Sequence, residues 1–196
     1  MHRRALMGSL PLATSACAAG QSDFGYARSN DPLYAALATA PENLSNMAEY
    51  RGRPAQAARA LAQFEFIIAE IQDKPDRVAL PAGVQPQLDA GQQEVRSTLG
   101  VAPDTPPRQV AAALDRFASA LDGGQRQEAM QALSQPFFAK GPQSTFEVLN
   151  NIPPMLALEA AAPSLALGPP GAAEAAMHQR LHRRQLLRGS MSNWSR

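Results

Sequence analysis

The sequence is poor in the side chains that carry most catalytic and metal chemistry. Among its 196 residues it has one cysteine, Cys17, and three histidines. A single cysteine cannot form an internal disulfide or supply the paired thiolates of a cysteine-based metal site. Aromatic residues make up only 6% of the chain, so we expect a core of alanine, leucine, valine and isoleucine. A His-dependent nucleophile would have to draw on His178 and His182, near the C-terminus.

The short motifs of common enzyme classes are also missing. The chain has no glycine-rich phosphate loop, no Gly-x-Ser-x-Gly elbow, no His-Glu-x-x-His and no Cys-x-x-Cys-His haem signature. These absences make an enzyme the least favoured function class without excluding it. They also give no reason to expect a cofactor.

The first residues have the three parts of an export signal. Arg3 and Arg4 form a short basic region, an apolar stretch follows over residues 5–13, and small residues then lead to Cys17. The apolar stretch is shorter than the roughly 20 residues that a membrane-spanning helix needs. This order predicts a signal peptide over residues 1–16, and its removal would place the mature chain outside the bacterial cytoplasm.

The segment from Leu12 to Cys17 resembles the cleavage site of bacterial lipoprotein precursors. Ser-Ala-Cys at residues 15–17 fits that pattern, whereas Thr14 stands where leucine is usual. The resemblance implies that Cys17 is lipidated, becomes the new N-terminus and anchors the protein to a membrane. Two alternatives stay open. Ordinary signal peptidase would leave a soluble periplasmic protein, and residues 3–7 resemble a twin-arginine export signal.

Charge is unevenly distributed along the mature chain. Residues 17–170 hold 11 basic and 16 acidic side chains, a balance of −5, whereas residues 171–196 hold 5 basic and 1 acidic, a balance of +4. An acidic body argues against binding to nucleic acid, which a basic body would favour. The basic tail permits three interpretations: a solubilising segment, a segment that packs on the acidic body, or a weak contact with anionic lipid.

Proline and glycine divide the body into short amphipathic segments. Apolar residues recur in these segments at three- and four-residue steps, the period of a helix. The most regular segment covers residues 54–72, where Leu61, Phe64 and Ile68 share one face. Asp31 and Pro32 predict the start of the first helix. Further helices are predicted over residues 41–50, 86–99, 107–121, 128–135 and 155–162, with a short one from residue 141.

No segment alternates apolar and polar residues as a half-buried strand does. We therefore predict an all-α fold, a small irregular antiparallel helix bundle over residues 31–163 that is punctuated by proline. A flexible tether over residues 17–30 precedes this domain. A linker over residues 164–173 follows it, and then a basic helical tail over residues 174–196. Ala173, Met177 and Leu181 would share one face of the tail helix.

Two sets of side chains offer candidate chemistry. His178 and His182, with Glu174 four residues before them, have a spacing that brings ligands to one metal ion. Four arginines crowd the same predicted helix and would repel a divalent cation, so we interpret it as a solvated basic tail and assign no metal. Carboxylates near the end of the 54–72 helix are interpreted as solvated or helix-end charges rather than catalytic pairs. They are Glu65, Glu70, Asp73 and Asp76.

Together these features favour an exported, lipid-anchored helical protein of the bacterial envelope with a binding, accessory or structural role. Its expected partners are a membrane, through the N-terminal lipid, and an unidentified envelope protein. Nucleic acid is not an expected partner. The alternative is a periplasmic helix bundle that holds a small apolar ligand in its interior.

Overall fold

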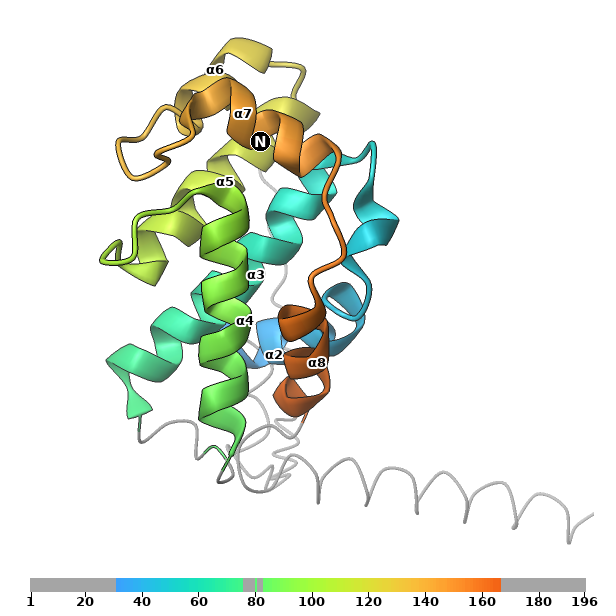
Figure 1. Ribbon diagram of the computed structural model, residues 1–196, viewed down its shortest axis with the longest axis vertical. Helices are drawn as coiled ribbons and strands as arrows, with labels where there is room; N and C mark the ends of the chain where they lie inside the picture. Colours follow the sequence, from blue (N-terminus) through green and yellow to red (C-terminus); the bar gives the residue numbers. More distant parts are fainter. Residues whose placement is uncertain (1–30, 76–79, 81–82, 167–196) are drawn as a thin grey trace, which may run out of the picture.

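The computed structural model describes residues 31–75, 80 and 83–166, and these residues form an irregular helix bundle (Figure 1). Within them there is no β-strand, so the all-α prediction is confirmed. In chain order the elements are α2 (Pro32–Asn43), the 3-10 helix η1 (Met47–Tyr50), α3 (Pro54–Asp73), α4 (Val84–Leu99), α5 (Pro107–Asp122), α6 (Arg126–Ala132), α7 (Gly141–Asn150) and α8 (Leu156–Leu165).

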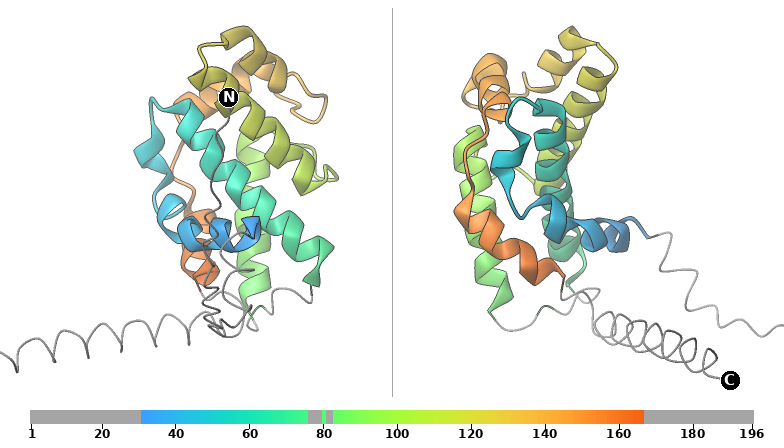
Figure 2. Two further views of the ribbon diagram at one scale, coloured as in Figure 1. Left: turned by 180° about the vertical axis from the view of Figure 1, so that it is seen from behind. Right: turned by 90° about the vertical axis from the view of Figure 1, so that its right-hand side faces the viewer.

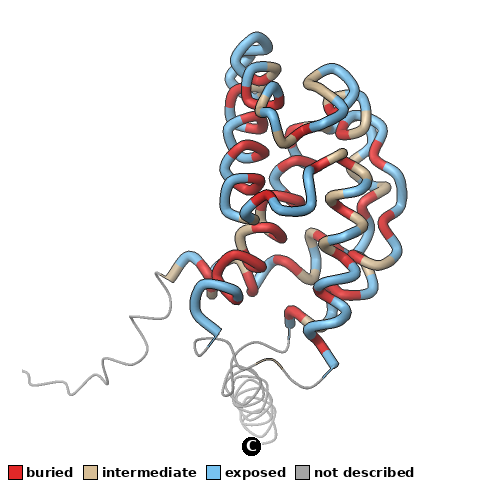
Figure 3. The backbone as a smooth tube through the Cα atoms, turned by 60° about the vertical axis from the view of Figure 1, so that its left-hand side comes forward, coloured by how far each residue is buried: buried red, intermediate tan, exposed pale blue. Residues whose placement is uncertain are grey.

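Helix α3 is the central element of the bundle. It contacts α2, α4, α5 and α7, and 13 of its 20 residues are buried. A helix with one neighbour buries a single stripe, so this wider burial follows from having neighbours on several sides. Helices α6 and α7 lie at one end of the molecule, and α2 and α8 lie toward the other (Figures 1 and 2). Buried positions recur along every helix (Figure 3).

Several helix boundaries lie where the sequence predicts them. The Asp31 carboxylate accepts a hydrogen bond from the Leu33 N–H at 3.0 Å, and Pro32 opens α2. This cap satisfies one of the backbone donors that a helix start leaves unpaired. Gly100 ends α4 at a φ of 72°, a left-handed conformation that glycine adopts without a steric penalty. Pro107 opens α5.

Proline marks helix boundaries less reliably elsewhere. We predicted a new helix from Pro41, but α2 continues through Pro41 to Asn43, and only the short η1 follows. Helix α8 likewise passes through Pro163 to Leu165. In both helices proline stands in the last turn, where one lost hydrogen bond is offset by burial of neighbours such as Ala40 and Leu165. Helix α6 begins before residue 128 and stops at Ala132, short of the predicted end at residue 135.

Helices α4 and α8 approach each other closely because of Gly91. A Cβ atom placed on Gly91 would lie 3.2 Å from the Leu158 Cα and 3.4 Å from the Phe64 ring. The Glu94 carboxylate then accepts hydrogen bonds from the N–H groups of Ala157 and Leu158, at 2.8 and 3.0 Å. An anionic side chain at the N-terminus of α8 stabilises that helix. The contact fixes α8 against α4.

A short backbone clasp joins the loop before α5 to the loop after α6. Val101 and Phe138 form an isolated antiparallel bridge. The Ala102 N–H donates to the Phe137 carbonyl at 2.9 Å, and the Ala139 N–H donates to the Gly100 carbonyl at 2.8 Å. The clasp therefore closes α5 and α6 into a loop that is tied at both ends. Its residues gave no sign of pairing in the sequence.

Candidate functional site

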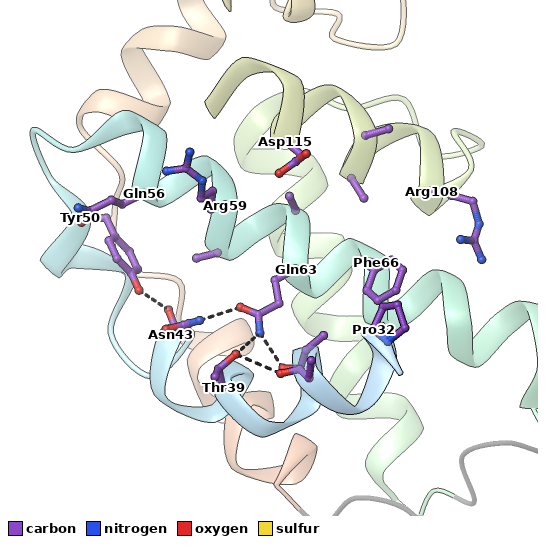
Figure 4. A pocket seen from close by; sticks show the side chains of 16 residues that line it. Pro32, Thr39, Asn43, Tyr50, Gln56, Arg59, Gln63, Phe66, Arg108 and Asp115 are labelled. Atoms are coloured by element: carbon purple, nitrogen blue, oxygen red, sulfur yellow. Dashed lines mark hydrogen bonds between the residues drawn. The ribbon is translucent and has the colours of Figure 1, made fainter. Parts of the chain in front are cut away.

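An open groove lies on the surface where α2, α3 and α5 meet (Figure 4). Its volume is about 880 Å³. It runs from Pro32, Phe66 and Arg108 to Tyr50 and Gln56. Because the groove opens to solvent, it differs from the enclosed interior cavity that a buried small ligand would require.

Alanine forms much of the groove surface. Each of the three helices supplies a pair of alanines to the lining: Ala35 and Ala36 from α2, Ala60 and Ala62 from α3, and Ala111 and Ala112 from α5. A methyl group lets helix backbones approach and leaves the space above it empty, where a larger side chain would fill it. The groove therefore lies between α2 and α5, over the side of α3 that both helices contact.

A hydrogen-bonded amide network borders one side of the groove. The Gln63 side-chain amide donates to the Ala36 carbonyl at 2.6 Å and to the Thr39 hydroxyl at 2.8 Å. Its oxygen accepts from the Asn43 amide at 2.8 Å. The Tyr50 hydroxyl donates to the Asn43 carbonyl at 2.9 Å. Figure 4 shows that the Gln63 bonds join α3 to α2 along the groove and that the Tyr50 bond joins η1 to α2.

The polar atoms of this network are already satisfied within the protein. Among the described residues, no buried side-chain nitrogen or oxygen lacks a hydrogen-bond partner. A site built for a small polar ligand normally presents a few convergent polar groups to it. This groove instead combines alanine methyl groups with the hydrogen-bonded side chains of Gln63 and Asn43, which is a surface suited to another polypeptide.

The charged residues that line the groove are Arg59, Arg108 and Asp115. Arg59 forms an ion pair with Asp122, and Arg108 bonds to Glu70 and Asp73 at 2.9 and 2.6 Å. Both arginines of the lining are thus balanced by carboxylates. Asp115 also lines the groove, from α5, and no described residue forms an ion pair or hydrogen bond with its side chain. The charge left uncompensated along the groove is therefore negative.

One carboxylate predicted to be solvated is instead fully buried. Glu65 has no exposed surface and lies between α3 and α4. Its oxygens accept from the Gln92 amide at 2.9 Å and from the Arg96 guanidinium at 3.3 Å. Burial raises the pKa of Glu65, and the bonds from Arg96 and Gln92 oppose that rise. The earlier interpretation of Glu65 as a surface charge is wrong because α4 brings it a cation and an amide.

The other three carboxylates of that set have different environments. Glu70 is also buried, and its carboxylate pairs with Arg108 and with Lys74, so the solvated interpretation is wrong there too. Asp73 is exposed, as predicted. Asp76 lies outside the described residues. Glu65, Glu70 and Asp73 form ion pairs with arginines of other helices, and no two of these three converge in an enclosed cleft that would suit acid–base chemistry.

The remaining candidates from the sequence cannot be placed. Cys17, Glu174, His178 and His182 all lie outside the described residues. Within residues 31–75, 80 and 83–166, no group of three or more His, Cys, Asp or Glu side chains is arranged to hold a metal ion. Sequence reasoning missed the groove itself, because its alanines come from three segments and carry no local signal.

Comparison with known proteins adds no relative. No family model, curated protein or solved structure matches this chain. Among the described helices, none combines the length and apolar character needed to cross a membrane. Function is therefore inferred from the sequence and from the geometry of the groove.

Proposed function

We propose that this protein is an exported, lipid-anchored binding or accessory protein of the bacterial cell envelope. The observation that carries the proposal is the N-terminal order of Arg3 and Arg4, an apolar stretch, and small residues that end at Cys17. Lipidation of Cys17 would attach the helical body to a membrane from its periplasmic side. The body would then act by contact with an envelope protein rather than by catalysis.

The groove between α2, α3 and α5 is the proposed contact surface. Its alanine lining, contributed by three helices, admits the close approach of a further helix, and the amides of Gln63 and Asn43 are already hydrogen-bonded. Binding there would gain mainly from apolar burial and surface charge, the usual mode of a helix that lies in a groove. A small apolar ligand has less support, since the groove is open and bordered by Gln63, Thr39 and Asn43.

Export and anchoring are tested together by fractionation with metabolic acyl labelling. We expect the wild-type protein in the membrane fraction with the acyl label on Cys17, and we expect Cys17→Ser to lose both. Soluble cytoplasmic protein that retains residues 1–16 would overturn export. An equal acyl label on wild type and Cys17→Ser would overturn the anchor.

The contact surface is tested by site-specific photo-crosslinking in the native envelope. A photoreactive residue at Ala35 or at Ala112, both exposed in the groove, should give one discrete crosslinked product with an envelope protein. Gln93 is an exposed residue of α4 away from the groove and provides the control position. Crosslinking that is equal at Gln93 and at the groove positions would overturn the groove as the docking surface.

A further inference from the structure

We propose that the C-terminal segment of this same chain, residues 171–196, is an occupant of the groove between α2, α3 and α5. The segment would cover the surface assigned above to an envelope partner, so the partner would have to displace it. The idea that the segment competes with an envelope partner rests on the proposed function. The contact between the segment and the groove of the same chain can be tested without a partner or a membrane.

Charge complementarity is the first argument. The segment holds five arginines and one glutamate, a balance of +4. The described residues hold nine basic and fourteen acidic side chains, a balance of −5. Within the groove both arginines are already balanced by carboxylates, and Asp115 has no described partner. A cationic segment therefore meets an uncompensated negative charge at this surface.

Side-chain size is the second argument. Ala173, Met177 and Leu181 recur at four-residue steps, which would align them on one face of a helix. A narrow apolar stripe of this kind suits a groove that presents the small side chains of Ala35, Ala36 and Ala112. The arginines at 180, 183, 184 and 188 would then lie beside or above the stripe, where their long stems can cover apolar surface while their charges reach the groove rim.

The chain is also long enough to reach the groove. The described chain ends at Ala166, directly after α8, and α8 contacts α2, which forms one wall of the groove. Five residues from 167 to 171, when extended, span about 17 Å. A helix with its side chains is about 10 Å in diameter, so this linker can pass around α2. The 17 residues from 172 to 188 would form a helix about 25 Å long, longer than the about 18 Å of α2.

Disulfide trapping in the full chain tests the contact. The variants carry Cys17→Ser, so that the only cysteines are an introduced pair. One pair joins Ala112→Cys in the groove to Met177→Cys in the tail, and a second pair joins Ala35→Cys to Met177→Cys. The control pair joins Gln93→Cys on α4 to Met177→Cys. All three body positions are exposed, so each substitution should leave the fold intact, and circular dichroism verifies this.

Under mild oxidation we expect at least one groove pair to form an intramolecular disulfide about tenfold faster than the control pair, because docking raises the local concentration of the tail thiol. Adding Arg180→Glu, Arg183→Glu and Arg184→Glu should remove this difference, as should raising the salt to about 1 M.

Groove pairs that react no faster than the control would overturn the proposal. A faster product that is a covalent dimer would overturn it as well, by assigning the groove to a second copy. Neither outcome bears on export or on the crosslinking of an envelope partner, so the two proposals fail separately.

Discussion

Helix α3 has a closed side toward α4, and on its other side, where it also packs along α5, a groove remains open between α5 and α2. Toward α4, the buried carboxylate of Glu65 meets Arg96 and Gln92, and the Phe64 ring lies against Gly91. Toward α2 and α5, the same helix presents alanines and the half-buried Gln63 to an open groove. One helix therefore contributes both to the packed interior and to the candidate binding surface.

Small residues have opposite effects on the two sides. On the closed side, Gly91 admits the backbone of α8, which fills the space that the missing side chain leaves. On the groove side, α2 and α5 each pack on α3, and no described helix fills the space between them above exposed alanines such as Ala35 and Ala112. A small residue thus creates a packed contact or a docking surface according to whether a further element occupies it. The closed side should consequently dominate stability, and the groove side should tolerate change.

The largest loss of stability is expected from Arg96→Met. This change removes the cation that faces a fully buried carboxylate, and leaving a buried charge unpaired costs about 3–5 kcal/mol. Urea unfolding near neutral pH measures this loss. The loss should shrink on acidification, because protonated Glu65 no longer needs the cation. A loss that is the same at acid and neutral pH would contradict this explanation.

Glu65→Gln is the matched variant and tests the sign of the pH dependence. Burial raises the pKa of Glu65 above its ordinary value of 4.5, so the folded state binds this proton more tightly than the unfolded state. The stabilising contribution is then complete below the unfolded pKa and is lost as pH rises through the folded pKa. Relative to wild type, Glu65→Gln should gain free energy of unfolding as pH rises from about 4 to about 8. A relative loss over that range would show that the pKa is lowered instead.

The next effect compares a valine introduced on α4, on the closed side of α3, with a valine introduced on α5, beside the groove. Gly91→Val adds a branched side chain where a Cβ already meets the Leu158 Cα, and overpacking of this kind costs about 1–3 kcal/mol. Ala112→Val adds the same kind of bulk at an exposed groove position, where the cost is about 0.6 kcal/mol or less, from helix propensity alone. Urea unfolding of both variants measures the difference. Equal losses would mean that α8 does not close that side as described.

The smallest effect is expected from the groove network. Gln63→Ala removes the amide that bonds to Ala36, Thr39 and Asn43, and we expect a loss of about 1 kcal/mol because the site is partly solvated. Gln56 lies on the same helix and is exposed, so Gln56→Ala should change stability by less than about 0.5 kcal/mol. Thermal unfolding of the two variants checks this. An equal shift of the unfolding midpoint in both variants would show that the network does not link α2 to α3.

The sequence predicts the helices best where periodicity and a boundary residue agree. The 54–72 segment forms α3 with Leu61, Phe64 and Ile68 buried, and Asp31 caps α2 as expected. Helix boundaries are predicted less well where a local signal such as proline conflicts with packing against distant segments. Pro41 indicates a boundary, yet the helix continues through it because its neighbours are buried in the core.

The candidate site was beyond prediction from sequence for a related reason. The sequence suggests that Glu65 and Glu70 are exposed, because the arginines that pair with them, Arg96 and Arg108, belong to other helices. The groove depends on alanines from α2, α3 and α5, and an alanine has the same appearance in a sequence whether it is covered or bare. Both features arise only when distant segments are placed together, which periodicity within one segment does not encode.

The clasp between Val101 and Phe138 has a consequence for how the groove wall opens. Because both ends of the α5–α6 unit are tied together, the start of α5 cannot separate from the end of α6 unless the bonds at Ala102 and Ala139 break in the same event. The amide protons of those two residues should therefore exchange with deuterium in one cooperative step with the α5 backbone. The clasp thus restrains the α5–α6 unit before anything binds, which lowers the ordering entropy that opposes a docking helix.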